Sequence, residues 1–195
     1  MKLLDIQDIL QWNNNMNDIR SKYIKLKELY IIDVSKSFEK KADKQDLIVH
    51  NPLSLHKDSN WQQYFNDQEL MNEIRNDIER TYSDDVFFNN KKTQQMMINI
   101  LFIWAKMNQD ISYRQGMNEL LAPLILTISH DANELFKFKD ISTSSAEFEG
   151  LLKQICHIDY IEHDCFYLFQ YLMHYMKQYF MYDSTKQNNE GNTTS

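Results

Sequence analysis

Two short segments that lie far apart along the chain carry side chains whose types and spacing could act on a phosphate. The first places Ile74, Asp77 and Arg80 at intervals of three residues, and the second is Tyr113-Arg114-Gln115-Gly116-Met117. The planar guanidinium of an arginine suits phosphate geometry and stabilises negative charge on phosphoryl oxygens. A glutamine can hold an attacking water in line with a phosphoryl group. The two segments therefore hold groups suited to phosphate hydrolysis, provided that the fold brings them together.

Each of these residues also has an ordinary structural interpretation. An arginine such as Arg80 in the last turn of a helix stabilises the helix dipole, and Asp77 with Arg80 can form a simple i,i+3 pair. Gln115 alone would be a solvated side chain, whereas Tyr113 and Met117 would belong to a core. Only the combination of both segments, in this order, favours a functional site.

In this order, the segments match the IxxDxxR and YxQGM motifs, and the chain resembles the TBC family of Rab GTPase-activating proteins. Further segments resemble one TBC subfamily that is associated with endosomal and retromer trafficking. The similarity covers roughly residues 10–181. The further segments are residues 45–54, Trp61, Phe65, 113–123 and 160–164.

The resemblance implies a GTPase activator that supplies two groups in trans to a Rab. At the matched positions, Arg80 is the arginine finger that stabilises transition-state charge, and Gln115 is the glutamine finger that replaces the Rab's own glutamine. GTP and Mg²⁺ come with the Rab, so no cofactor of its own and no metal are expected. Supporting or Rab-binding roles fall to Asp77, Tyr113, Gly116 and Met117, of which Gly116 lets the backbone approach the GTPase closely.

The chain also departs from the family pattern. The RxxxW motif is not found near the N-terminus, and the C-terminal helical lobe does not follow Phe180. We therefore expect a partial TBC domain over residues 1–182. Residues 183–195 are polar and are expected to be a disordered tail.

Composition and periodicity predict an all-α fold, an irregular helical array. Glycine occurs 3 times and proline twice, and alternating β-type runs are few, so helices should dominate. Helices are expected over 3–29, over 91–107, from near Gln115 toward Ser129, and over 160–180. Pro123 should kink or divide the third of these, and residues 137–146 should form a polar connector.

The segment before Arg80 suggests two helices in succession. Residues 58–60 can cap a short helix that carries Trp61, Tyr64 and Phe65. Asp67 can then cap a second helix with an apolar stripe that ends near Arg80. The preceding segment, residues 36–51, is charged and lacks helical periodicity.

Charge and cysteine content exclude several classes of protein. The net charge of −7 disfavours a nucleic-acid binder, which needs a basic field. No apolar stretch is long enough to span a bilayer, and two cysteines without a signal peptide indicate the cytoplasm, with peripheral association at endosomal membranes suggested by the resemblance. The spacing of Cys156, His157, His163 and Cys165 does not match usual zinc patterns.

Two other classes of function stay open at this point. A TBC domain can bind a Rab without stimulating hydrolysis, and a helical adaptor can dock a retromer or endosomal coat component. The presence of both Arg80 and Gln115 favours the catalytic interpretation.

Overall fold

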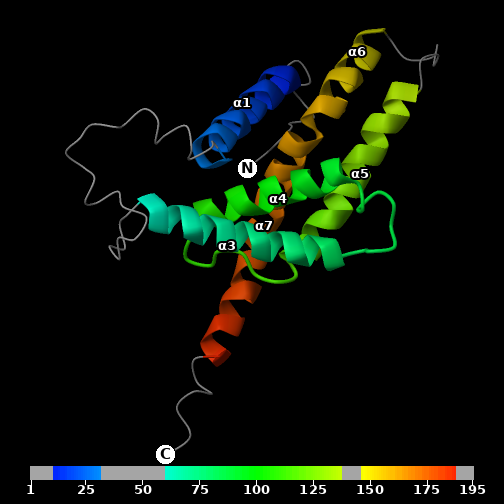
Figure 1. The fold of residues 1–195 in the computed structure, drawn as a ribbon. Coiled ribbons are helices and arrows are strands. Elements are labelled where there is room, and N and C mark those ends of the chain that lie inside the picture. The colour runs from blue at the N-terminus through cyan, green and yellow to red at the C-terminus, as the bar shows by residue number, and fades with distance from the viewer. Residues whose placement is uncertain (1–10, 32–59, 138–145, 188–195) are drawn as a thin grey trace, which may run out of the picture.

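The computed structural model describes residues 11–31, 60–137 and 146–187, and every regular element within these ranges is a helix. The helices cross at varied angles instead of aligning as a bundle (Figure 1). The expected all-α fold is therefore confirmed. The elements are α1 (Trp12–Ile31), α3 (Asn60–Arg80), α4 (Lys91–Met107), α5 (Met117–Lys137), α6 (Ala146–Ile155), the 3₁₀ turn η2 (Ile158–Tyr160) and α7 (Ile161–Gln187).

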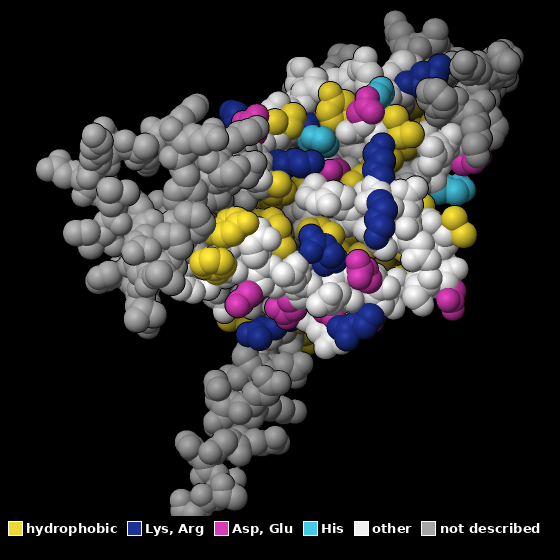
Figure 2. All heavy atoms as spheres, in the orientation of Figure 1, with side chains coloured by type: hydrophobic (Ala, Val, Ile, Leu, Met, Phe, Trp, Pro, Cys, Tyr) yellow, Lys and Arg dark blue, Asp and Glu magenta, His cyan; other side chains and the backbone are white. Residues whose placement is uncertain are grey.

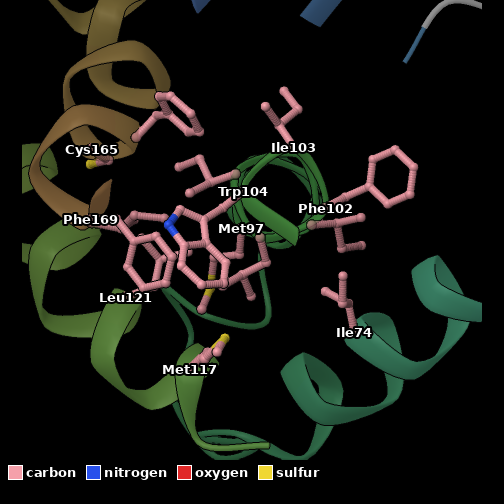
Figure 3. Close-up of a cluster of buried hydrophobic side chains, with 14 of the residues drawn as sticks. Ile74, Met97, Phe102, Ile103, Trp104, Met117, Leu121, Cys165 and Phe169 are labelled. Atoms are coloured by element: carbon pink, nitrogen blue, oxygen red, sulfur yellow. The ribbon is translucent and has the colours of Figure 1, made fainter. Parts of the chain in front are cut away.

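Helix α4 forms the centre of the molecule. It contacts α1, α3, α5 and α7, and its residues 97–105 are all buried. Figure 3 shows α4 nearly end-on, with Ile74 of α3, Met117 of α5 and Phe169 of α7 directed toward it. A helix that is apolar on more than one side must be covered on more than one side, so α4 fixes the positions of α3 and α5.

The bounds of α4 agree with the expected helix over 91–107, because both ends are capped by asparagine. The Asn90 side chain accepts a hydrogen bond from the Lys92 backbone N–H at 2.8 Å. At the other end, the Asn108 amide donates to the Trp104 carbonyl at 2.9 Å. These side chains satisfy terminal backbone groups that a helix cannot pair internally.

The expectation of two helices before Arg80 is wrong, since α3 runs without a break from Asn60 to Arg80. Asp67 does not cap a second helix. Its carboxylate instead accepts a hydrogen bond from the Lys106 ammonium of α4 at 2.7 Å, and both side chains are largely shielded from solvent. The Asp67 carboxylate, which the local sequence suggested as a helix cap, thus forms an ion pair with a distant helix instead.

Helix α5 continues past Pro123 to Lys137 instead of dividing there. The expected connector over residues 137–146 begins at the last residue of α5 and ends at the first residue of α6, and the residues between, 138–145, are outside the described residues. Helix α7 continues to Gln187, beyond the domain boundary expected at residue 182. Three further expectations concern residues outside the described ranges. They are the remainder of the tail, the charged segment 36–51, and the first residues of the N-terminal helix.

Arg20 of α1 joins three helices through one guanidinium. It donates to both carboxylate oxygens of Asp164 in α7, at 2.9 and 2.6 Å, and to the carbonyls of Gln154 and Ile155 at the end of α6. The guanidinium also lies 4.3 Å from the ring centre of Tyr160. Arg20 therefore caps the end of α6 and ties α1 to α6 and α7.

Charged side chains of both signs are interspersed on the face drawn in Figure 2. This arrangement lacks the single-sign field that binds nucleic acid. Within the described ranges, no helix is long and apolar enough to cross a membrane.

Candidate functional site

Arg80 is the last residue of α3, and its side chain extends into solvent with 71% of its surface exposed. One terminal nitrogen of its guanidinium donates to the Asp77 carboxylate one turn earlier. Asp77 is itself buried. A buried carboxylate thus holds one edge of the guanidinium, while the exposed remainder keeps donors available for a partner.

The chain leaves α3 through a residue in a left-handed conformation. Tyr82 has a φ of 51°, in the left-handed region that commonly ends helices and that glycine usually occupies. The Tyr82 ring stacks on the ring of buried Phe88, with 4.9 Å between the centroids. This contact helps to offset the strain of a left-handed tyrosine.

Gln115 lies in the turn before α5, and its side chain is exposed. The residues around it adopt unusual backbone conformations, since Ser112 has a φ of 58° and Gly116 a φ of 96°. Directly after the turn, Met117 is fully buried against α4 (Figure 3). The turn is therefore anchored by Met117 while Gln115 stays accessible.

Tyr113 connects this turn to α3. Its hydroxyl donates to the Asp77 carboxylate at 3.0 Å, at the oxygen that does not bind Arg80, and lies 3.2 Å from the side-chain oxygen of Asn118. Burial raises the pKa of Tyr113, and the negative charge of Asp77 raises it further. The hydroxyl therefore stays protonated and keeps its role as a donor to Asp77.

Asn118, in the first turn of α5, is also buried at this junction. Its amide nitrogen donates to the Asp77 carbonyl at 3.3 Å and to the Thr81 hydroxyl, and its oxygen accepts from the Gly116 N–H at 3.1 Å. The end of α3 and the turn before α5 are thus joined by a continuous buried network.

The network forms the floor of one cleft that has a volume of about 360 Å³. Arg80 reaches it from the end of α3 and Gln115 from the turn before α5, so two segments distant in sequence meet at one exposed surface. The other lining residues are Asp77, Thr81, Tyr82, Asn118 and Glu119. The cleft presents a guanidinium and a carboxamide to whatever docks over it.

Comparison with known proteins agrees with this arrangement. The family model described as Rab-GTPase-TBC domain matches residues 29–191, which is most of the chain. The chain belongs to the Rab-GTPase-TBC domain family.

Curated relatives carry the same domain name. TBC1 domain family member 5 homolog B of Dictyostelium discoideum is 35% identical over 186 residues, which cover 95% of this chain and 17% of that protein. TBC1 domain family member 5 of Mus musculus is 33% identical over 174 residues, which cover 89% of this chain and 20% of that protein. Rab GTPase-activating protein tbc-8 of Caenorhabditis elegans is 32% identical over 62 residues, 32% of this chain and 7% of that protein. No solved structure matches the chain.

This TBC chain therefore spans about a fifth of the length of the mouse relative and less of the other two. Its two motifs nevertheless lie complete within the described ranges, together with the helices that position them.

The structure brings four of the six expected site residues to one cleft, whereas Gly116 and Met117 belong to the turn beside it and Met117 is too deeply buried to contact a partner. Arg80, Gln115 and Asp77 line the cleft, and Tyr113 binds Asp77 beneath it. Gly116 and Met117 follow Gln115 directly and set the turn, so α5 begins at Met117, two residues later than Gln115.

Sequence reasoning missed Asn118 and Thr81, although a signal for Asn118 exists in this TBC chain. Residues 118, 121, 122 and 125 share one helical face, and the last three are apolar and buried. A polar residue on such a face needs hydrogen-bonding partners. Those partners lie on another helix, so only the fold reveals them.

His163 and Cys165, near the start of α7, are packed against neighbouring side chains. Tyr23 and Tyr160 both contact the His163 ring edge-on, at centroid distances of 5.1 and 5.3 Å. Burial lowers the pKa of His163 and raises the pKa of Cys165, which keeps both groups neutral. In the described part of this TBC chain, no group of three potential metal ligands comes together.

Proposed function

We propose that this chain accelerates GTP hydrolysis by a Rab-family GTPase, with Arg80 and Gln115 as the catalytic residues. The observation that carries the proposal is the shared cleft, where both side chains are exposed above a buried network. Membership of the Rab-GTPase-TBC domain family supports a Rab as the partner. One relative is itself named a Rab GTPase-activating protein.

In this mechanism the chain contributes position and charge. The GTPase brings GTP and Mg²⁺, so the chain needs no cofactor of its own. As the bond to the γ-phosphoryl group breaks, negative charge grows on the phosphoryl and leaving oxygens, and the Arg80 guanidinium stabilises it. The Gln115 carboxamide orients the attacking water in place of the GTPase's own glutamine.

Asp77 gives this mechanism its geometry. One carboxylate oxygen binds Arg80 and the other accepts from Tyr113. The bond to Asp77 therefore restricts the rotamers of Arg80 before the GTPase binds. Positioning before binding lowers the entropy that the transition state must lose.

Single-turnover hydrolysis by a panel of GTP-loaded Rabs tests the proposal. On a Rab that the full chain stimulates, Arg80→Ala should remove roughly 10³-fold or more of the stimulation. Gln115→Ala should remove about 10²-fold or more. Both variants should still bind the Rab, because their backbone network is unchanged.

Two exposed positions on α3 provide matched controls. Arg75 bonds Asn72 on its own helix at 2.8 Å, and Gln62 lies at the opposite end of α3 from Arg80. Arg75→Ala and Gln62→Ala should keep full stimulation. The catalytic proposal would be overturned if Arg80→Ala and Gln115→Ala stimulated GTP hydrolysis as strongly as these two controls.

A second candidate is a catalytically inactive Rab-binding or adaptor module. The tests above separate the two classes, since an adaptor would bind its partner without raising the hydrolysis rate of any Rab. The exposed positions of Arg80 and Gln115 on one cleft favour the enzyme activator.

We further propose a cytoplasmic protein that acts peripherally at endosomal membranes, on an endosomal Rab and with a retromer or endosomal coat partner. Resemblance to the endosomal TBC subfamily supports this proposal. Part of that resemblance, residues 45–54, lies outside the described residues. Imaging of the tagged chain tests the location, and a diffuse distribution that ignores endosomal markers would contradict it.

A further inference from the structure

We propose that Asn118 is a positioning residue that sets the separation of the two fingers. This inference rests on the proposed function, because it assigns a role within the same site. Asn118 is a buried residue on the floor of the cleft, and its proposed role requires no contact with the GTPase or its nucleotide.

Asn118 bonds the residue that directly follows each finger. Thr81 follows Arg80, and its hydroxyl accepts from the Asn118 amide nitrogen. Gly116 follows Gln115, and its N–H donates to the Asn118 oxygen at 3.1 Å. One planar group therefore ties together the two backbones that carry the guanidinium and the carboxamide.

The Asn118 amide is fully used in this arrangement. Its oxygen also lies 3.2 Å from the Tyr113 hydroxyl, and its nitrogen also donates to the Asp77 carbonyl at 3.3 Å. Only 4% of the residue is exposed. A side-chain amide offers two donors and one acceptor oxygen, so rotating it by half a turn would misalign its bonds to both segments.

A purely local role does not account for these contacts. Capping the start of α5 needs only the oxygen, which binds Gly116 two residues earlier. The nitrogen reaches across to the last turn of α3. This second half of the amide serves the junction between the two segments and adds nothing to the α5 helix start.

Asn118→Asp removes the N–H donors of that half and adds a carboxyl group close to the Asp77 carboxylate, with which it shares the Tyr113 hydroxyl. The replacement has nearly the same shape and keeps an oxygen for Gly116 and Tyr113, but it places a second oxygen against the Asp77 carbonyl. The end of α3 should shift away from the turn. We expect the maximal stimulated hydrolysis rate to fall about 10- to 100-fold, because small displacements of reacting groups have effects of this size. The chain concentration needed for half-maximal stimulation should change little.

Thr81 provides a second variant in case Asn118→Asp fails to fold. Thr81→Val removes the hydroxyl that accepts from Asn118 and should lower the maximal rate in the same way. Thr81→Ser keeps the hydroxyl and should therefore retain most of the maximal hydrolysis rate. Asn133→Asp is the matched control, because Asn133 is an exposed residue of α5 whose amide donates to the Ser129 carbonyl of its own helix and, among the described residues, bonds no other segment.

The factor by which Arg80→Ala lowers the hydrolysis rate distinguishes a positioning role of Asn118 from general destabilisation. If Asn118 positions the fingers, Arg80→Ala should lower the rate by a smaller factor in the Asn118→Asp or Thr81→Val background than in the unaltered chain. A merely structural role would lower the melting temperature and leave that factor unchanged, which would overturn the inference. Full maximal rates in folded Asn118→Asp and Thr81→Val would also overturn it. An unaltered chain that stimulates no Rab would instead overturn the proposed function, and the inference with it.

Discussion

The same substitution at two glycines should have opposite effects on stability. Gly116 sits in the turn that presents Gln115, and Gly150 lies inside α6. At both positions a new Cβ atom would meet none of the described residues within 4 Å, so crowding among them is not a factor at either site. The two differ in backbone conformation, because Gly116 has a φ of 96° and Gly150 is helical.

The magnitudes follow from that difference. A left-handed conformation costs a residue with a Cβ about 1–2 kcal/mol, so Gly116→Ala should lower the melting temperature by about 2–8 °C in a chain of this size. Alanine in a helix is about 0.5–1 kcal/mol better than glycine. Gly150→Ala should therefore raise the melting temperature by about 1–4 °C.

Thermal unfolding followed by circular dichroism measures both shifts. Gly116→Ala should also lower Rab stimulation, since relief of the strain moves Gln115, whereas Gly150→Ala should leave it unchanged. Shifts of the same sign, or a stabilising Gly116→Ala, would refute the reasoning that this turn requires glycine for its backbone conformation.

Two further predictions concern buried charge and titration. Arg20→Ala should lower the free energy of unfolding in urea by about 3–5 kcal/mol, because it leaves the largely buried Asp164 carboxylate unpaired; a loss below about 1 kcal/mol would contradict the role of this pair. Burial raises the pKa values of Tyr23 and Tyr113 above the ordinary value of 10. The folded chain therefore holds these protons more tightly than the unfolded chain, and the free energy of unfolding should fall as the pH rises above about 10. Replacing both residues with phenylalanine should flatten that decline. An unchanged pH profile would show that these two tyrosines do not cause it.

The helix over residues 91–107 is predictable because its apolar pattern and both of its asparagine caps are local. The continuity of α3 is not predictable from the sequence, because Asp67 is a good candidate for a helix cap. Only the fold shows that its carboxylate binds Lys106 of another helix instead. The end of α6 likewise depends on Arg20, a residue far away in sequence. Local signals thus locate most helices, while contacts between helices decide where some of them begin and end.

The site shows the same division. The pair of motifs, in their order along the chain, predicts Arg80 and Gln115 as site residues, although neither residue type alone is specific to the chemistry. It does not reveal that Gly116 is needed for its backbone angle, nor that Asn118 bonds the neighbours of both fingers. These features are properties of the junction between α3 and the turn before α5, and neither segment displays them alone.

In the proposed function, the chain supplies its own glutamine to the GTPase. The most direct test is single-turnover GTP hydrolysis by a stimulated Rab whose own catalytic glutamine has been replaced with alanine. We predict that the unaltered chain still accelerates this Rab and that Gln115→Ala does not. Failure of the unaltered chain to accelerate the glutamine-deficient Rab, while it still accelerates the normal one, would contradict the assigned role of Gln115.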